Sequence, residues 1–405
     1  PYTMSKSIND ELTATVIALE YENLQALLIS ATVCLINTFL ADKIREMISK
    51  ETAVPVSNII ISATHTHSGP NTGGAFGWGD IDEKYCSNIF IPQIINAAKE
   101  AILNLKPAKL GIGTIESYVG INRRQLKKDN KIYLGQNPYG CFDKIMTVLS
   151  FKGLDDSPIV NIIHYGAHCT AAGCNTEITR DWAGVMIDRL EKESEAVTAF
   201  FNGAEGDVGP RLPNGLTTGD ISYAMELGAI AGYDAVCVYK SIKEYQYIDL
   251  KVVTDEIKIP YRPRLSLDDA ERALDELEGE ITVNLTGQKY KFLNDVISAY
   301  KLNLPEKKYL VLKQTIVRIG PVVFIPFAYE VFSEISLRLR EYSAFPYTLC
   351  LSNTNGNFGY LPSQDQICRG GYEIEMFLSG DVQSLVDDAD NYFISENLRL
   401  MEKIK

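Results

Sequence analysis

The central part of the chain carries the pattern that most constrains the fold. Residues 159–168 form an apolar, strand-like run, residues 181–195 carry an apolar stripe at helical spacing, and residues 197–201 form a second apolar run. A strand, a helix and a strand in this order predict a parallel strand pair with a right-handed crossover. Residues 145–151 precede this unit across a short loop, and we expect them to pair with residues 159–168 as an antiparallel hairpin.

The alternation of strands and helices continues on both sides of this unit. It predicts an α/β fold of mixed β-sheets with flanking helices, built as one large domain over residues 1–405. Residues 250–310 are more polar and helical, and we interpret them as a candidate insertion or cap. The other expected strands cover residues 13–21, 24–31, 58–64, 109–119, 310–319, 322–326 and 347–352, and the other expected helices cover residues 33–50, 91–105, 221–240 and 330–342.

The composition narrows the functional classes. Apolar residues make up 46% and charged residues 22% of the chain, which is typical of a folded globular protein and excludes fibrous and disordered classes. The formal net charge of −13 argues against nucleic acid as a partner, because nucleic-acid binding requires clustered Lys and Arg, and only the short run 123–128 is basic. No apolar stretch reaches the roughly 20 residues that a membrane span requires, so we expect no transmembrane segment.

The eight cysteines are scattered and form no CxxC pair, which favours reduced thiols and a cytoplasmic location. The chain begins at Pro1 without a methionine, so a lost N-terminus and secretion stay open as alternatives. The oligomeric state is left open.

The four histidines lie in two pairs, each where a predicted strand ends. His65 and His67 follow one strand, and His164 and His168 lie at the end of another. Their even spacing allows each pair to point to one side of its strand, and ligand sites in α/β sheets favour the carboxyl ends of strands. An HxH pair is a frequent zinc-binding pattern. We therefore predict a metal site, with hydrogen-bonded strand-end histidines as the alternative; spacing does not choose an acidic ligand among 52 carboxylates.

A glycine-rich segment, residues 200–211, follows the strand 197–201. Its glycines would let the backbone approach a ligand closely, and a tight strand-to-helix connection is the alternative. Trp78, in the loop after the HxH pair, is interpreted as a packing group, with a substrate platform as the alternative.

Seven motifs along the chain resemble those of the neutral/alkaline non-lysosomal ceramidase family. They occur in the family's order and together cover most of the chain, from about residue 12 to 400. The motifs are Ser62-Ala63-Thr64-His65-Thr66-His67-Ser68-Gly69-Pro70, Gly120-Ile121-Asn122-Arg123-Arg124, His164 to Thr170, Asn202 to Pro210, Glu330-Val331-Phe332-Ser333-Glu334, Asn355-Gly356-Asn357-Phe358-Gly359-Tyr360, and Tyr372-Glu373.

The resemblance implies a zinc-dependent hydrolase with a single ceramidase-like catalytic domain. It places the zinc ligands on His65, His168, Glu330 and Tyr360, and the substrate-facing positions on His67, Arg123 and Tyr372. Zinc-bound water, which ionises near pH ~7, would then attack an amide carbonyl. In that mechanism His67 would orient the carbonyl or move a proton, Arg123 would stabilise the oxyanion, and Tyr360 would occupy a labile position on the ion. His164 and Asp181 are expected to support the ligands by hydrogen bonds, with helix capping as the alternative for Asp181.

Three features depart from the family pattern. Gly209 stands where the family usually has a serine before the proline, so binding of the polar part of the substrate must differ there. The approach to Glu330 is longer and bulkier than usual, which leaves Glu334 as a competing ligand. The chain ends soon after the last motif, so we expect no C-terminal immunoglobulin-like domain.

These features give three functional hypotheses. The first is hydrolysis of an N-acyl amide bond in a ceramide-like or smaller substrate. The second is a non-catalytic metal- or ligand-binding relative, and the third is an esterase-like hydrolase of a small polar substrate.

Overall fold

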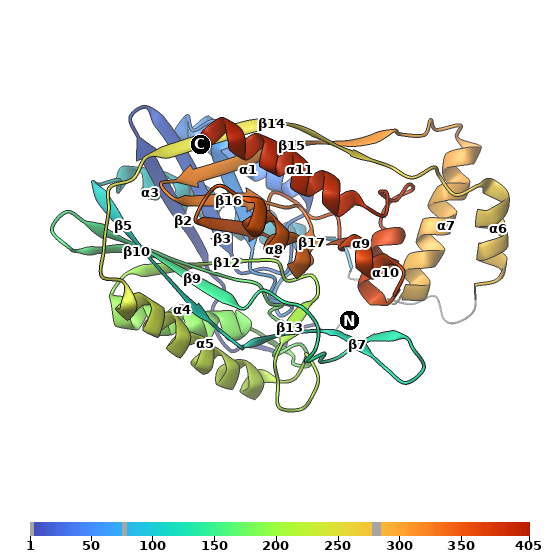
Figure 1. Ribbon diagram of the computed structural model, residues 1–405, viewed down its shortest axis with the longest axis horizontal. Helices are drawn as coiled ribbons and strands as arrows, with labels where there is room; N and C mark the ends of the chain where they lie inside the picture. Colours follow the sequence, from blue (N-terminus) through green and yellow to red (C-terminus); the bar gives the residue numbers. More distant parts are fainter. Residues whose placement is uncertain (1–3, 75–78, 278–284) are drawn as a thin grey trace.

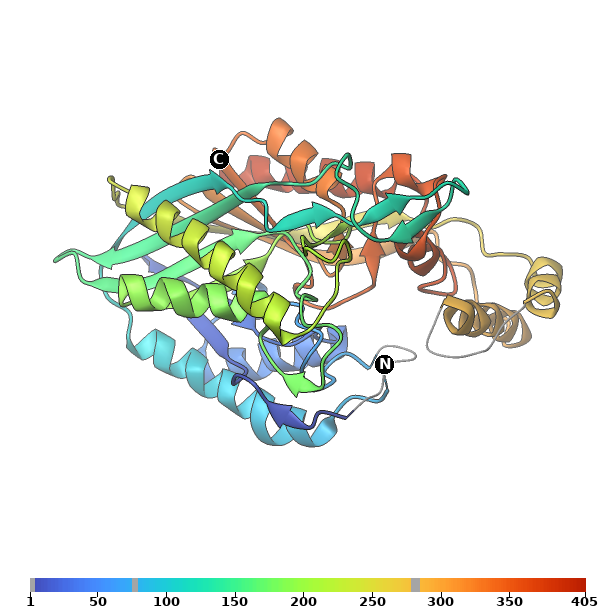
Figure 2. The ribbon, with the colours of Figure 1, turned by 90° about the horizontal axis from the view of Figure 1, so that it is seen from below.

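The computed structural model describes residues 4–74, 79–277 and 285–405, so the prediction for Trp78 lies outside the described residues. Three β-sheets share one apolar core, to which Leu28, Phe201 and Phe324 contribute from one sheet each. Figures 1 and 2 show helices covering the outer sides of the sheets. The predicted α/β fold of mixed sheets with flanking helices is confirmed.

The first sheet contains β2 (Ala14–Tyr21), β3 (Leu24–Ala31) and β4 (Ile59–Ala63). β2 and β3 pair antiparallel, whereas β3 and β4 pair parallel. Helices α1 (Thr38–Thr52) and α3 (Ile91–Leu103) pack on it through a second apolar cluster. β4 is buried along its whole length and ends directly before the HxH pair.

The second sheet contains the predicted central unit, with strand order β12-β10-β9-β5. β10 pairs parallel with β12 and antiparallel with β9, as the sequence predicts. Helices α4 and α5 cover its outer face. The elements are β5 (Ala108–Glu116), β9 (Ile145–Gly153), β10 (Pro158–Tyr165), β12 (Val197–Asn202), α4 (Asp181–Ser194) and α5 (Ile221–Ser241).

The third sheet has the order β14-β15-β16-β18. β16 and β18 pair parallel, and the other neighbours pair antiparallel. Its apolar cluster includes residues of the helices α8 and α11. The elements are β14 (Leu250–Pro260), β15 (Tyr309–Ile319), β16 (Val322–Pro326), β18 (Tyr347–Leu351), α8 (Ser333–Tyr342) and α11 (Ala389–Met401).

The segment 250–310 differs from its prediction at its N-terminal end, where the structure has the strand β14. Its two ends belong to the long strands β14 and β15, which pair from Leu250↔Ile319 to Pro260↔Tyr309. Between them α6 (Leu267–Asp275) and α7 (Leu285–Lys301) form a helical pair that projects from the body (Figures 1 and 2). The sequence predicted the helices and the strand that follows them, β15, but not β14, the strand that precedes them.

Short strand pairs and helices connect the sheets around their common edge. The pairs are β1 (Ser7–Ile8) with β11 (Glu177–Ile178), β6 (Gly120–Asn122) with β13 (Val208–Pro210), β7 (Arg124–Leu126) with β8 (Ile132–Leu134), and β17 (Glu330–Val331) with β19 (Tyr360–Leu361). The short helices are α2 (Glu83–Tyr85), α9 (Gln364–Ile367) and α10 (Tyr372–Leu378).

Two helix starts fall later than predicted. α1 begins after Asn37, whose side-chain oxygen accepts a hydrogen bond from the Phe39 amide, so the cap fixes the start rather than the apolar run before it. α8 begins at Ser333, because Glu330 and Val331 pair with another strand instead.

One described helix, α5, is long and apolar enough to cross a membrane by length and composition alone. In the structure one side of α5, which includes Leu227, Ala231 and Ala235, packs against α4 and the second sheet, whereas Met225 and Ile230 are exposed.

Candidate metal centre

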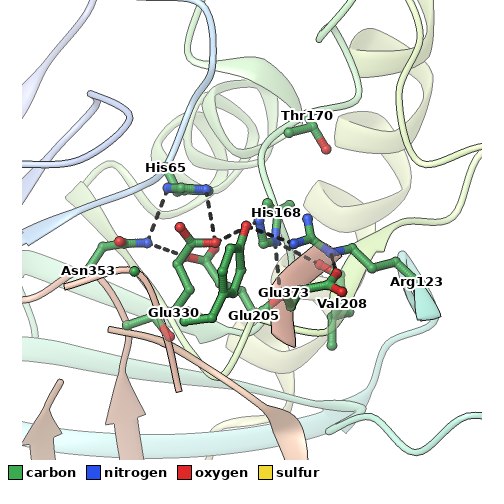
Figure 3. A network of polar contacts seen from close by, with 12 residues as sticks. His65, Arg123, His168, Thr170, Glu205, Val208, Glu330, Asn353 and Glu373 are labelled. Carbon is green, nitrogen blue, oxygen red and sulfur yellow. Dashed lines mark hydrogen bonds and ion pairs between the residues drawn. The ribbon is translucent and has the colours of Figure 1, made fainter. Parts of the chain in front are cut away.

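Three residues from distant parts of the sequence meet at the common edge of the sheets. His65 follows β4, His168 follows β10, and Glu330 opens β17. The carboxylate oxygen Oε2 of Glu330 lies 3.0 Å from Nε2 of His168 and 3.7 Å from Nε2 of His65. Figure 3 shows the Glu330 carboxylate beside both imidazoles. Among the described residues, these three form a buried group whose ligand atoms all lie within 4.8 Å of one another.

Backbone carbonyls determine which nitrogen of each imidazole faces this centre. Nδ1 of His65 lies 2.8 Å from the carbonyl oxygen of Cys34, and Nδ1 of His168 lies 2.9 Å from that of Glu205. A carbonyl only accepts, so Nδ1 carries the proton in both rings. The Nε2 lone pairs therefore point toward Glu330.

This arrangement fits a metal ion. Nε2 of His168 and Oε2 of Glu330 are buried and make no hydrogen bond, although such atoms are normally satisfied. A bare imidazole lone pair against a carboxylate oxygen is repulsive, and a cation between them removes the repulsion. Two imidazole nitrogens and one carboxylate oxygen are the ligand set of many catalytic zinc sites.

Burial prepares the ligands for such an ion. It lowers the pKa of His65 and of His168 to about 4, so both imidazoles are neutral at pH 7. Burial alone would raise the pKa of Glu330, but the adjacent His65, His168 and Arg123 outweigh it and hold that pKa below its usual range. Neutral imidazoles and an ionised carboxylate are the forms that bind metals.

Tyr360 and Arg123 lie next to the ligand group. The parallel pair β17–β19 places Tyr360 directly opposite Glu330. An N–H of the Arg123 guanidinium donates to the Tyr360 hydroxyl at 2.9 Å. Burial and the neighbouring Glu330 raise the pKa of Tyr360 well above its usual range, so its phenol is protonated at neutral pH.

Glu373 orients two arginines at this site. It accepts hydrogen bonds of 2.8 Å from Nε of Arg123 and from the Arg124 guanidinium, and it is 1% exposed. The preceding Tyr372 is partly buried, and its ring meets that of Tyr360 edge-on at 5.8 Å. The structure thus brings Arg123, Tyr360 and Tyr372 together.

His67 also reaches the centre. Its Nε2 lies 3.1 Å from Nε2 of His65, and the side chain is only partly buried. Burial, followed by the neighbouring His65, lowers the pKa of His67 to about 3. This histidine is therefore neutral at physiological pH.

The competing ligand Glu334 lies elsewhere. Its carboxylate contacts the thiol of Cys141, and it is absent from the ligand group formed by the described residues. It lies in the first turn of α8, which begins only after the β17 strand that carries Glu330.

His164 and Asp181 were predicted to support the ligand imidazoles by hydrogen bonds, but both bond to backbone groups instead. Nε2 of His164 lies 2.8 Å from the carbonyl oxygen of Cys350, inside the sheet core. The Asp181 carboxylate accepts from the amides of Ala171, Ala172 and Trp182, so it fixes the loop after His168. The alternation pattern could not reveal that backbone groups supply these partners.

Gly209 lies in β13 with no room for a side chain. A Cβ atom there would lie 2.6 Å from Cβ and Cγ2 of Thr217. Close packing against Thr217 therefore explains why this position holds glycine.

Sequence reasoning missed Glu205 and Asn353. Glu205 is fully buried, its carboxylate accepts from the amides of Asn202 and Asn353, and its carbonyl oxygen holds His168. Burial and the neighbouring Glu330 raise the pKa of Glu205 well above its usual range. Glu205 lies in the glycine-rich segment that the sequence singled out, but no spacing distinguishes it from other acids.

The fold and the site together define an α/β protein with a buried His–His–Glu group that could hold a metal ion, beside an arginine–tyrosine pair. The sequence profile described as neutral/alkaline non-lysosomal ceramidase, N-terminal, matches residues 13–223, which is more than half of the chain. The chain belongs to this family.

Named relatives and solved structures agree with that assignment. The chain is 29% and 28% identical to neutral ceramidases B and A of Dictyostelium discoideum over 170 residues, which make up 38% of this chain but only 24% of each relative. A structure described as "Ceramidase complexed with C2" aligns with a TM-score of 0.69 and 17% identity over 97% of this chain and 69% of that one. The neutral ceramidase from Pseudomonas aeruginosa aligns with a TM-score of 0.68 and 16% identity over 98% and 74%. At these identities the two structures establish the fold alone.

Proposed function

We propose that this protein is a zinc-dependent hydrolase that cleaves the amide bond of an N-acyl substrate, either ceramide-like or smaller. The observation that carries the proposal is the pair of buried atoms without hydrogen bonds, Nε2 of His168 and Oε2 of Glu330, beside Nε2 of His65. His65, His168 and Glu330 would hold the ion, with Tyr360 opposite Glu330 as the fourth candidate ligand. A zinc ion bound there would polarise a carbonyl and lower the pKa of a coordinated water to about 7.

The remaining residues supply substrate binding and charge stabilisation. Arg123 and the Tyr360 hydroxyl lie 2.9 Å apart and present donors that can stabilise negative charge on a carbonyl oxygen. His67 is neutral and partly exposed, so its ring N–H can donate a hydrogen bond that orients the substrate carbonyl. Tyr372, beside Tyr360, is positioned to contact the substrate.

Metal analysis tests the site first. We expect stoichiometric zinc in protein purified without added metal, and its loss in His65→Ala. His164→Gln is the matched control, because His164 is equally buried but bonds the Cys350 carbonyl outside the ligand group. Negligible zinc in the wild type, unchanged by His65→Ala, would contradict the proposal.

Activity measurements then test the chemistry. We expect turnover of short, water-soluble N-acyl amides, with a loss of about a hundredfold in kcat for Tyr360→Phe if its hydroxyl stabilises the transition state. An ester series measured in parallel distinguishes an amidase from an esterase-like hydrolase.

Gly209 favours a second candidate function, a metal- or ligand-binding relative without turnover. The usual serine is replaced by glycine, and Thr217 fills the space that its Cβ would need. Equal background rates for the wild type and Tyr360→Phe on every amide and ester, with zinc still bound, would support this function instead.

A further inference from the structure

A short hairpin beside the site presents apolar side chains to solvent. β7 and β8 pair antiparallel, with Arg124 opposite Leu134 and Leu126 opposite Ile132. Leu126 is 61% exposed and Leu134 is 47% exposed, and this register places both on the same face of the hairpin. Tyr139, in the segment that follows, is 97% exposed. Figure 1 shows the hairpin extending away from the body.

The turn of this hairpin is basic. It contains the exposed residues Lys127, Lys128 and Lys131. The one acid of the turn, Asp129, accepts hydrogen bonds from the Tyr133 hydroxyl and the Lys131 amide, which directs its carboxylate back toward the hairpin. The Lys127 ammonium lies 4.4 Å from the centre of the Tyr133 ring. In a chain of net charge −13, three lysines within five residues are a local exception.

The hairpin adjoins the candidate site at two points. At its base, β7 begins directly after Arg123, whose guanidinium contacts Tyr360. Next to the turn, Ile132 opens β8 and packs against Gly371, where an added Cβ would lie 2.9 Å from the isoleucine side chain. Gly371 directly precedes Tyr372. An object that touches the hairpin tip is therefore adjacent to the substrate-binding residues.

We propose that the β7–β8 hairpin docks the protein on a membrane surface that carries anionic headgroups. Leucines with flanking tyrosines suit the interfacial region of a bilayer, and lysines on long apolar stems reach the headgroup phosphates. The three lysines complement an anionic surface. The exposed leucines favour a membrane over a soluble phosphate, because a soluble phosphate has no apolar part for them to contact. The docking itself does not depend on the proposed function. The purpose of the docking, which is to deliver an acyl-chain substrate, does rest on the proposed function.

Vesicle sedimentation of the full chain tests the docking. We expect binding to vesicles of phosphatidylcholine with phosphatidylserine, weak binding to phosphatidylcholine alone, and release at high salt. Replacing Lys127, Lys128 and Lys131 by Glu should lower the partition coefficient by at least roughly a hundredfold, and Leu126→Asp with Leu134→Asp should also abolish binding.

Two matched variants control for general effects. Lys106, Lys192 and Lys243 are exposed lysines outside the hairpin, and replacing them by Glu changes the net charge equally. Leu154→Asp alters an exposed leucine in the β9–β10 turn. Both variants should bind vesicles like the wild type. Hairpin variants that sediment like the wild type, or a wild type that binds no vesicle, would overturn the proposal.

A soluble short-chain N-acyl amide separates this proposal from the proposed function. Hairpin variants should turn it over at the wild-type rate, because none of the changed residues contacts the metal ligands. Vesicle binding without any turnover or zinc would refute the proposed function and leave the docking intact. Turnover with zinc but without vesicle binding would refute the docking alone. Binding to an acidic protein in place of vesicles would also refute it.

Discussion

His65 adopts a backbone conformation that few residues other than glycine accept. Its φ is 71°, in the left-handed region, which costs about 1–2 kcal/mol for a residue with a Cβ. Two hydrogen bonds hold it there. The His65 amide donates to the carbonyl oxygen of Val33, and Nδ1 of His65 donates to the carbonyl oxygen of Cys34. The strain redirects the chain as β4 ends, and it fixes the imidazole with Nε2 toward Glu330. Such strain is typical of functional sites.

At the same scale, Glu373 is expected to act as a positioning residue for Arg123. Its single carboxylate holds two buried guanidinium groups, so Glu373→Gln removes the charge that balances them. We expect the free energy of unfolding to fall by about 3 kcal/mol. We expect kcat on a soluble substrate to fall at least about tenfold with unchanged zinc content, because Arg123 loses its orientation but the ligands do not. Urea denaturation, metal analysis and steady-state kinetics measure the three quantities.

Glu375→Gln is the control on the same helix. Glu375 pairs with Lys289 at the surface, where an ion pair contributes at most about 1 kcal/mol. This variant should keep the wild-type kcat. If Glu373→Gln also kept it, Arg123 would not depend on Glu373 for its position.

At the scale of elements, short pairings build the site. β17 and β19 are two residues long, yet their register places Glu330 opposite Tyr360. Hydrophobic periodicity predicts strands of several residues, so it located β4, β10 and β12 but gave no sign of β17. The metal ligands could be named from motif resemblance because their residue types are distinctive. Glu205 and Asn353 could not, because their role depends on which buried atoms lie nearby in three dimensions.

The contact of β13 with the loop after it gives a second prediction at this scale. Gly209→Ser would place a Cβ 2.6 Å from Thr217, so we expect a loss of about 1–3 kcal/mol in the free energy of unfolding. Thr217→Gly removes both contacting carbons and should restore most of that loss in the double variant. A double-mutant cycle of urea denaturation measures the coupling. Additive effects of the two substitutions would show that contact with Thr217 is not the reason why position 209 requires glycine.

At the scale of the molecule, one core joins three sheets, and the site lies where strands of all three end. The sequence predicted the alternation of strands and helices, and the central parallel pair in particular. The sequence could not predict how the sheets pack against one another. Buried strands such as β4 are apolar on both faces, so their sequence does not indicate which sheet they contact. The same limit hid the strand β14 inside a segment interpreted as an insertion.

The projecting helical pair gives the last prediction: the rest of the chain should fold and bind zinc without α6 and α7. Arg264 donates to the carbonyl oxygens of Leu304 and Pro305, at 3.0 and 3.1 Å, and so brings the two ends of the segment together. A short Gly-Ser linker in place of residues 266–303 can therefore close the gap. The apolar cluster of the pair is built almost entirely from its own residues, with Val382 as its contact on the body.

Polar links to the body are few among the described residues. Lys289 pairs with Glu375, and Gln288 donates to the Ser379 carbonyl. We therefore expect the shortened chain to fold, to keep its zinc and to lose about 1–2 kcal/mol in the free energy of unfolding. Metal analysis and urea denaturation measure both, with Lys289→Ala as the control that breaks only the ion pair. α10 begins at Tyr372, and the partners of α7 lie in this helix (Glu375) and directly after it (Ser379). A change in KM without a change in zinc would therefore assign the helical pair to substrate binding. Loss of zinc would contradict the independence of the body, since it would mean that the ligands depend on α7 through α10.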